Sequence, residues 1–310
     1  MSNGTSVTEF LLLAFPEVRE LQILYFVGFL AAYLAALVGN LLIMSAITLD
    51  RRLHTPMYFF LANLSLLDLG SISVIVLKSM ANALTNTRRI SYHSCMGQVF
   101  FFLLFATTEL PLLTVMAYDR YVAICRPLNY TRVMNSRACA QMAAGTWLSG
   151  VLNSALHTGN TFAIIFCGDN ELGQFFCEIP QLLRLACYDS YLGETGAIVV
   201  SVCFALTCFA FIIVSYVLIF RTVLGIPSEH GRRKAFSTCL PHLAVVSLFV
   251  CTASIAYIKP TSSSGSELDL VVAVLYSVVP PMMNPIIYSM RNKDIKAALR
   301  KMFGPRLFSS

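Results

Sequence analysis

Charged side chains are scarce in this chain: they make up 12% of the 310 residues, where a soluble domain has roughly 25%. Apolar residues make up 57%. The sequence also lacks a phosphate-binding glycine loop, a cluster of metal ligands, and a supporting motif around any serine or histidine. These absences argue against a soluble protein and against an enzyme.

Long apolar runs are what the chain has instead. Each exceeds the roughly 20 residues that a helix needs to cross about 30 Å of hydrocarbon, and a spanning helix satisfies its own backbone there. We therefore predict an all-α membrane protein: a bundle of seven transmembrane helices over 21–290, preceded by a tail (1–20) and followed by a short segment (291–310). The runs are 21–49, 53–77, 90–118, 138–168, 195–220, 235–258 and 270–290.

Basic residues are distributed unevenly between the connections. If the amino terminus is extracellular, 16 of the 22 Lys and Arg residues fall on the cytoplasmic side, as the positive-inside rule requires. The net charge of +6 then reflects topology, and no nucleic-acid partner is needed to explain it. We expect a multi-pass protein of the plasma membrane with a cytoplasmic carboxyl terminus.

The outer tail carries an acceptor sequence for N-linked sugar at Asn3, and we expect this residue to be glycosylated. Asn63 and Asn129 match the same pattern, but they fall in the membrane and in the cytosol. No cleavable signal peptide is evident, because the apolar stretch at 11–15 is too short. The first helix is expected to act as its own insertion signal.

Four motifs recur in order along the chain: LHTPMYFFL from Leu53, MAYDRYVAIC from Met116, KAFSTC from Lys234 and PMMNPIIYSMRN from Pro281. Together they resemble the vertebrate olfactory receptors of tetrapod type, a branch of the rhodopsin-like (class A) G-protein-coupled receptors. The resemblance implies a receptor for small, mostly apolar odorants. It also implies coupling to a heterotrimeric stimulatory G protein of the olfactory type, which raises cyclic AMP.

Ten cysteines divide by the side of the membrane, and four lie outside, where the compartment permits disulfides. Four cysteines allow three pairings. The resemblance implies that Cys95 pairs with Cys177 and that Cys167 pairs with Cys187. A metal site is the alternative, and it is disfavoured because Gln174 stands where the family often has a histidine.

Two carboxylates, Asp68 and Glu109, lie in mid-membrane, where an acid costs on the order of 2.5–3.5 kcal/mol. One interpretation is a pair of protonated or hydrogen-bonded acids that hold helices together. The other, which we favour, is a sodium or proton site that modulates the resting state. The resemblance implies that Asn40 and Asn284 lie nearby. Apart from this sodium ion, no cofactor is expected.

An acid followed by an arginine at the inner end of the third run is typical of a receptor switch. The resemblance implies that Arg120, in the motif with Asp119 and Tyr121, is released toward Tyr216 and Tyr288 when the sixth helix moves. An ordinary surface ion pair, worth about 0–1 kcal/mol, is the alternative.

The end of the seventh run combines a helix break with an amphipathic segment. Pro285, after Asn284 and before Tyr288, removes a backbone donor and is expected to kink the helix. The following segment predicts a short eighth helix that lies on the anionic lipid of the inner leaflet. Its apolar face holds Ile295, Leu299, Met302 and Phe303, and its basic residues are Lys293, Lys296, Arg300 and Lys301.

The outer half of the bundle is expected to bind the ligand. The outer third helix contains no acid to anchor an amine, and the seventh has no lysine for a retinal Schiff base. A transporter is the main alternative class, but the inverted halves typical of transporters are not seen. A small apolar ligand with one polar handle should bind with an affinity between millimolar and about tens of micromolar. Its expected contacts are Phe102, Leu103, Ala106, Thr107, Val202, Ala205, Leu206, Ser254 and Tyr257.

Three positions depart from the usual pattern of the family. Val250 stands where an aromatic residue is common, Pro241 replaces a frequent serine, and Pro111 interrupts the third helix just after Glu109. We expect the prolines to loosen the bundle, raising basal activity or lowering surface expression.

Overall fold

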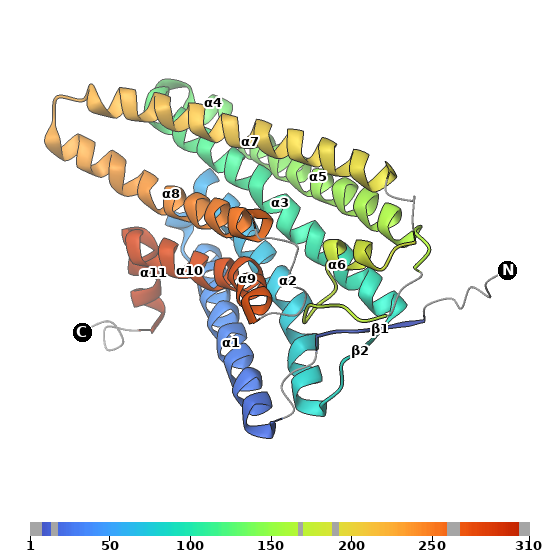
Figure 1. The fold of residues 1–310 in the computed structure, drawn as a ribbon. Helices are drawn as coiled ribbons and strands as arrows, with labels where there is room; N and C mark the ends of the chain where they lie inside the picture. Colours follow the sequence, from blue (N-terminus) through green and yellow to red (C-terminus); the bar gives the residue numbers. More distant parts are fainter. Residues whose placement is uncertain (1–7, 14–17, 167–169, 188–191, 259–266, 304–310) are drawn as a thin grey trace.

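The computed structural model describes residues 8–13, 18–166, 170–187, 192–258 and 267–303 (Figure 1). Asn3 lies outside these ranges. The chain folds into long helices joined by short connections. The long helices are α1 (Arg19–Leu49), α2 (Pro56–Thr85), α3 (Tyr92–Cys125), α5 (Ser136–Phe162), α7 (Leu192–Leu224) and α8 (Glu229–Ile258), followed by α9 (Glu267–Ser277) and α10 (Val279–Arg291). The short elements are η1 (Arg51–Leu53), η2 (Pro127–Asn129), α4 (Tyr130–Val133), α6 (Ile179–Arg184), α11 (Lys293–Phe303) and the strands β1 (Glu9–Leu11) and β2 (Arg89–Ser91).

The spans agree with the apolar runs of the sequence. Among the described residues, six helical stretches are long and apolar enough to cross a membrane, the last of them formed by α9 and α10 together. The helix α5 is long enough at 27 residues, but it carries many serine, threonine and asparagine side chains. With α5 included, the predicted bundle of seven transmembrane helices and a short eighth helix is confirmed.

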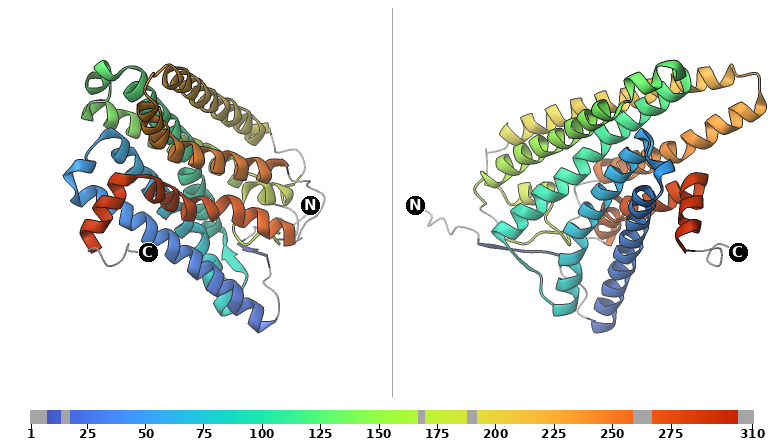
Figure 2. Two further views of the ribbon diagram at one scale, coloured as in Figure 1. Left: turned by 90° about the vertical axis from the view of Figure 1, so that its left-hand side faces the viewer. Right: turned by 180° about the vertical axis from the view of Figure 1, so that it is seen from behind.

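The elements at the two ends of the bundle differ. The strands β1 and β2 lie at one end, called here the outer end (Figure 1). The turn between α7 and α8 and the helix α11 lie at the other, the inner end, as both views of Figure 2 also show. The position of each functional side chain is described below as nearer to the outer end or nearer to the inner end.

The amino-terminal segment is more ordered than the expected tail. Strand β1 pairs antiparallel with β2, and Phe10 lies opposite Ile90. Phe10 and Leu12 are buried against Cys95 and Leu182, so they join an apolar cluster that covers the outer end. Phe10 and Leu12 thus give this segment a place in the apolar core.

The last span is divided in two at Val278. Pro280 and Pro281 follow immediately, and they fit best in the first turn of a helix, where the backbone donor that proline lacks would have no partner in the helix. Helix α10 therefore begins anew at Val279. Pro285, inside α10, packs against α1 at Gly39, where an added Cβ would lie 2.9 Å from the proline ring.

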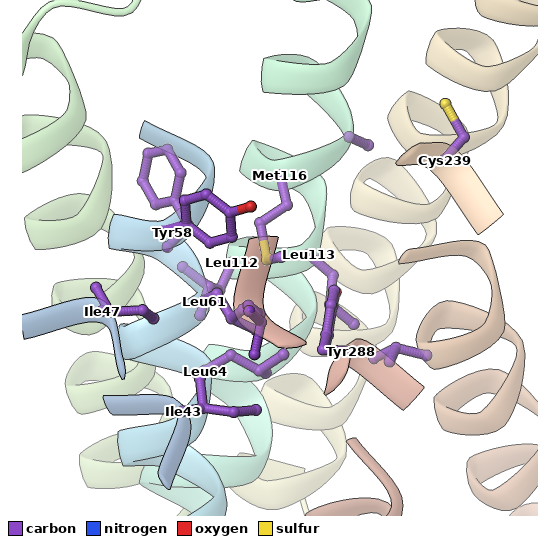
Figure 3. Close-up of a cluster of buried hydrophobic side chains, with 14 of the residues drawn as sticks. Ile43, Ile47, Tyr58, Leu61, Leu64, Leu112, Leu113, Met116, Cys239 and Tyr288 are labelled. Atoms are coloured by element: carbon purple, nitrogen blue, oxygen red, sulfur yellow. The ribbon is translucent and has the colours of Figure 1, made fainter. Parts of the chain in front are cut away.

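The largest apolar cluster fills the inner half of the bundle. Ile43, Leu64 and Leu112 are fully buried there, together with Met116 and Tyr288 (Figure 3). These residues come from α1, α2, α3 and α10, so the cluster joins the first three helices to the last. The cluster packs against the part of α3 that carries the switch residues.

A single glycine sets the distance between α3 and α5. A Cβ added to Gly150 would lie 1.9 Å from Thr108 Oγ1, and Thr108 is itself fixed by a 2.6 Å bond to the carbonyl of Leu104. Gly150→Ala should therefore lower the free energy of unfolding by about 1–3 kcal/mol through overpacking. Gly145→Ala, in the same helix with no atom within 4 Å of the added Cβ, is the matched control. Thermal denaturation of the solubilised protein checks this, and equal melting temperatures would contradict the close contact.

Candidate ligand site and switch

Arg120, in the last two turns of α3, pairs with its neighbour Asp119. Its Nε donates to Asp119 Oδ2 at 2.9 Å, and its Nη2 donates to the same oxygen. The Asp119 side chain is 1% exposed and that of Arg120 12%. An ordinary exposed surface pair, the alternative considered from the sequence, does not describe this geometry, because the carboxylate is buried and the guanidinium is largely covered.

Tyr130, on the inner-end helix α4, completes this arrangement. Its hydroxyl donates to Asp119 Oδ1 at 2.8 Å, so both oxygens of the carboxylate are engaged. Burial, followed by the negative charge of Asp119, raises the pKa of Tyr130, and the phenol keeps its proton. The sequence analysis gave Tyr130 no role. Its position eleven residues after Asp119, just past a short helical turn, was the available signal.

Tyr216 on α7 is held by a histidine of α8. The hydroxyl lies 2.7 Å from His242 Nδ1, and His242 Nε2 lies 3.0 Å from the carbonyl oxygen of Leu113 on α3. Because a carbonyl can only accept, Nε2 carries the proton, and Tyr216 donates to Nδ1. The Tyr216 hydroxyl is therefore bonded to His242 and is not available to Arg120 in this structure. The sequence interpretation missed His242.

A cavity of about 20 Å³ lies beside the arginine. That is large enough for one water molecule. Tyr288 lines the cavity, and its buried hydroxyl has no hydrogen-bond partner within the described part of the chain. Arg120, His242 and Tyr288 are thus brought together. Tyr121 is not: its ring lies 6.0 Å from the guanidinium carbon of Arg126.

The mid-membrane acids meet at an asparagine. Asn284 Nδ2 lies 3.0 Å and 3.3 Å from the two oxygens of Asp68, and 3.4 Å from Glu109 Oε1. Asn40 does not bond to either acid, because its amide donates to the carbonyls of Ala36 and Pro281, each at 3.0 Å. Asp68 on α2, Glu109 on α3 and Asn284 on α10 therefore lie together as expected. Asn40 on α1 does not join them, because its amide is bonded elsewhere.

A cation would require one change in this cluster. Among the described residues, no group of three or more His, Cys, Asp and Glu side chains is arranged to hold a metal ion. The Oδ1 atoms of Asn284 and Asn40 are buried and have no hydrogen-bond partner among the residues that the structure describes. If the Asn284 amide turned over, its oxygen would join the carboxylates of Asp68 and Glu109, and hard cations prefer such all-oxygen surroundings. The donor set fits sodium in that orientation.

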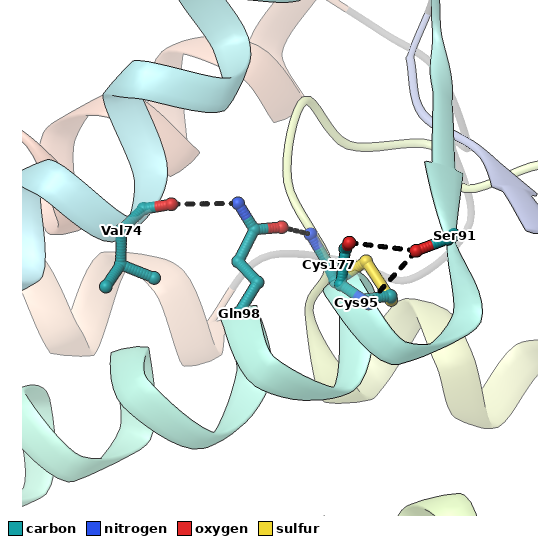
Figure 4. Close-up of a disulfide and its surroundings, with 6 residues drawn as sticks. Val74, Ser91, Cys95, Gln98 and Cys177 are labelled. Carbon is teal, nitrogen blue, oxygen red and sulfur yellow. Dashed lines mark hydrogen bonds between the residues drawn. A yellow bond between two sulfur atoms is a disulfide. The ribbon is translucent and has the colours of Figure 1, made fainter.

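A disulfide ties the outer end of α3 to the segment before α6. Cys95 and Cys177 are bonded, with their Cα atoms 5.6 Å apart. The backbone nitrogen of Cys177 donates to Gln98 Oε1 at 2.8 Å, and Gln98 Nε2 donates to the carbonyl of Val74 at 3.0 Å (Figure 4). Cys187 is also in a disulfide, whereas Cys167 lies outside the described residues.

The expected ligand contacts are only partly brought together. The four positions on α3 are half-buried, as is Ala205 on α7. Val202 and Leu206, however, are 48% and 62% exposed, so the structure does not bring them together with the half-buried positions, and their contact with a ligand stays a prediction. Ser254 is exposed, and the side chain of Tyr257 lies outside the described part. The sequence could not show which residues of α7 are buried, because a helix that is apolar on all sides has no periodicity to mark its inward face.

Aromatic side chains close the outer end above these contacts. Phe176 packs against Phe102 at 5.4 Å and against Tyr276 at 6.3 Å between ring centroids. The Tyr276 hydroxyl donates to Glu178 Oε1 at 2.7 Å, which links α9 to the segment before α6. Phe175 packs on Phe29 of α1. Phe175 and Phe176, directly before Cys177, were the feature of the sequence that could have predicted these aromatic contacts. The sequence analysis did not use it.

A comparison with protein families agrees with this arrangement. Residues 29–306 match the model described as olfactory receptor. The chain belongs to the olfactory receptor family. This receptor is 52% identical to olfactory receptor 14I1 of Homo sapiens over 303 residues, which cover 98% of the chain and 97% of the relative. It is 49% identical to human olfactory receptor 14J1 over 97% of the chain and 94% of the relative, and 47% identical to gorilla olfactory receptor 1G1 over 98% and 97%. It is a multi-pass membrane receptor and not an enzyme.

The outer disulfide yields a test by combining substitutions. Cys95→Ser and Cys177→Ser should each lower surface delivery to the same degree, because removing a native disulfide typically costs about 2–5 kcal/mol. The double substitution should be no worse than either single one, since all three variants lack the same bond. Flow cytometry of intact cells measures the surface level, with Cys203→Ser, an exposed free cysteine, as the control. Additive losses would contradict the pairing.

Proposed function

We propose that this receptor binds small, mostly apolar volatile molecules within the outer half of the bundle. Family membership supports an odorant as the ligand. The half-buried positions Phe102, Leu103, Ala106, Thr107 and Ala205 form one wall of the proposed site. Tyr257, one span away on α8, is the proposed polar contact.

We further propose that the bound odorant activates a stimulatory, olfactory-type heterotrimeric G protein and raises cyclic AMP. The observation that carries this proposal is the buried Arg120–Asp119 pair beside a cavity that Tyr288 also lines. Arginine in this position can exchange one partner for another without being exposed to bulk lipid. A movement of α8 would take His242 away from Tyr216, and the freed hydroxyl would then be available to Arg120.

The acid pair is proposed to set the resting state. With Asn284 as a shared donor, Asp68 and Glu109 hold α2, α3 and α10 together. Sodium in place of this donor would strengthen the same three-helix contact, because a cation attracts both carboxylates at once. Both the hydrogen bonds of Asn284 and a bound sodium ion would oppose a movement of α10.

The orientation proposed is an extracellular amino terminus, with sugar on Asn3, and a cytoplasmic carboxyl terminus. In α11, Ile295, Ala298 and Leu299 are buried against the bundle. Lys296 and Arg300 are exposed beside them. Anionic lipid headgroups of the inner leaflet suit this face, since basic residues near such a surface contribute about 1 kcal/mol each.

Arg120→Ala should abolish the cyclic AMP response to an activating odorant while the receptor still reaches the cell surface. The reason is that the arginine acts at the inner end, far from the odorant. A cyclic AMP reporter, normalised to surface level, makes the measurement. The control is Arg52→Ala, which breaks an exposed pair with Asp50 at the same end. Full signalling by Arg120→Ala would refute the proposed switch.

Asp68→Asn should remove any dependence of basal cyclic AMP on sodium concentration, and Glu109→Gln should weaken it. Loss of a carboxylate removes the charge that attracts the cation, while the neutral amide can still form hydrogen bonds. Basal signalling is compared in sodium and in N-methylglucamine buffers of equal ionic strength. A sodium response that persists in both variants would exclude the ion site and leave the hydrogen-bonded acid pair.

A further inference from the structure

A groove separates α7 from α8 in the inner half of the bundle. Its volume is about 280 Å³, and its walls are apolar. Helix α7 packs chiefly on α3, whereas α8 packs on α10 and α9, so the two helices are not closely packed on each other beyond the turn that joins them (Figure 1). The groove walls include Phe209, Ile213, Val217 and Phe220 on α7, with Leu243 and Val246 on α8.

This groove opens toward the surrounding lipid. Ile213 and Val217, on its α7 wall, are 47% and 43% exposed, while Ile212 and Val246 inside it are buried. In a transmembrane span an exposed side chain faces hydrocarbon. The groove is therefore a recess in the lipid-facing surface. It is separate from the proposed odorant site, which lies nearer the outer end and uses other residues.

The groove offers no partner to a polar ligand. Among the side chains that line it, only Tyr216 carries a polar atom, and this hydroxyl lies 2.7 Å from His242 Nδ1, to which it is bonded. A ligand with a polar handle would leave that handle unpaired in hydrocarbon, which is costly. The occupant must therefore be hydrocarbon along the whole groove, and an odorant with a polar handle does not fit.

The length of the groove matches one leaflet of a bilayer. Phe209 and Phe220, at its two ends, are eleven residues apart on α7, which is about 16 Å at a rise of about 1.5 Å per residue. The hydrocarbon of a whole bilayer is about 30 Å thick. A helix of that length, about 10 Å in diameter, would occupy on the order of 1,300 Å³, several times the volume available. The groove therefore suits a single hydrocarbon chain and is too small for a helix of another protein.

A positive charge lies where the groove ends. Arg221 directly follows Phe220, in the last turn of α7, and its side chain is exposed. None of the ion pairs among the described residues includes Arg221. A guanidinium binds phosphate oxygens through two parallel hydrogen bonds. The headgroup of a phospholipid whose chain lies in the groove would reach the level of Arg221, whereas a neutral sterol would leave this charge unused.

We propose that the groove binds one acyl chain of an anionic phospholipid from the leaflet at the inner end, with the lipid phosphate at Arg221. Lipid chains are as apolar as leucine, so removal from water does not hold the chain in this place. The chain is held by contacts with side chains that otherwise lack neighbours, and by the charge of Arg221. Because Tyr216 forms part of the wall, the chain contacts the residue whose bond to His242 the proposed switch breaks.

The test uses the full-length receptor in bilayer nanodiscs that contain a phosphatidylserine with a photoreactive diazirine in one acyl chain. After irradiation, mass spectrometry of peptides locates the label. Labelling of 209–220 and 243–246 should exceed severalfold that of Leu34 and Leu41 on α1, which are exposed to the same lipid. Unlabelled phosphatidylserine should displace the label at a roughly fivefold lower concentration than phosphatidylcholine, the ratio expected of one basic residue near an anionic headgroup. Equal labelling of α1 and the groove would overturn the proposal.

Two matched pairs of variants separate the chain from the headgroup. Val217→Trp should fill the groove and lower the labelling of 243–246 severalfold. Val214→Trp makes the same change on α7, at a position that is 55% exposed and does not line the groove, and should leave the labelling unchanged. Arg221→Gln should remove the preference for phosphatidylserine, and Arg137→Gln, at an exposed arginine of α5, should keep it.

Undiminished labelling in Val217→Trp would mean that the label reports only the surrounding lipid, and the proposal would then be wrong. Displacement by cholesterol but not by phospholipid would identify a sterol as the occupant and would equally overturn it. If Val217→Trp does not fold, Ile213→Trp on the same wall repeats the test, and the labelling pattern of the unmodified receptor decides without either variant. None of these measurements uses an odorant or cyclic AMP, so their failure is distinct from a failure of the proposed odorant function.

Discussion

Exclusion of water from the bilayer is the constraint on which this structure depends. A polar side chain inside the bundle must find its partner within the protein, because hydrocarbon offers none, and a group that cannot bond to its own helix must find that partner on another. Asn284 meets Asp68 and Glu109 for this reason, and so three helices are joined at one point. His157 on α5 and Glu194 on α7 join two more helices. Apolar contact alone would discriminate poorly between helix arrangements in lipid, so these few polar contacts specify which helices are neighbours.

The same constraint makes the inner end able to switch. Asp119 is shared between Arg120 and Tyr130, and Tyr216 is bonded to His242. Asp119, Tyr216 and His242 are buried and Arg120 and Tyr130 are partly buried, so releasing one hydrogen-bond partner is costly unless another replaces it. Movement of α8 or α4 therefore exchanges hydrogen bonds instead of merely breaking them. Such an exchange has a small net free energy, which a weakly bound ligand is able to supply.

The spans were predictable because the requirement for about 20 apolar residues leaves a clear mark in the sequence. The meeting of Asp68 with Glu109 was also predictable, since two buried acids need partners. The rotation of α7 was not, because Val202 and Leu206 lie in a run without polar residues to mark its inward face. His242 was missed for another reason: its role depends on a contact with Leu113, which is distant in the sequence. Tyr130 is only eleven residues from Asp119, and it was missed because the turn that brings the two together was not recognised. The strand at β1 was missed because three residues are too few to show a period.

Strand β1 also has a consequence for the order in which the receptor assembles. It pairs with residues 89–91, and Leu11 bonds to Asn170 and Leu172 on the same side. Both partner segments leave the ribosome long after β1 does. The segment with Asn170 and Leu172 follows only after four membrane spans have been made. The outer cover of the bundle must therefore close late, as a long-range step that follows insertion of the helices. Until then Phe10 and Leu12 lack their buried partners, so an unfinished receptor carries exposed apolar side chains that chaperones are able to bind.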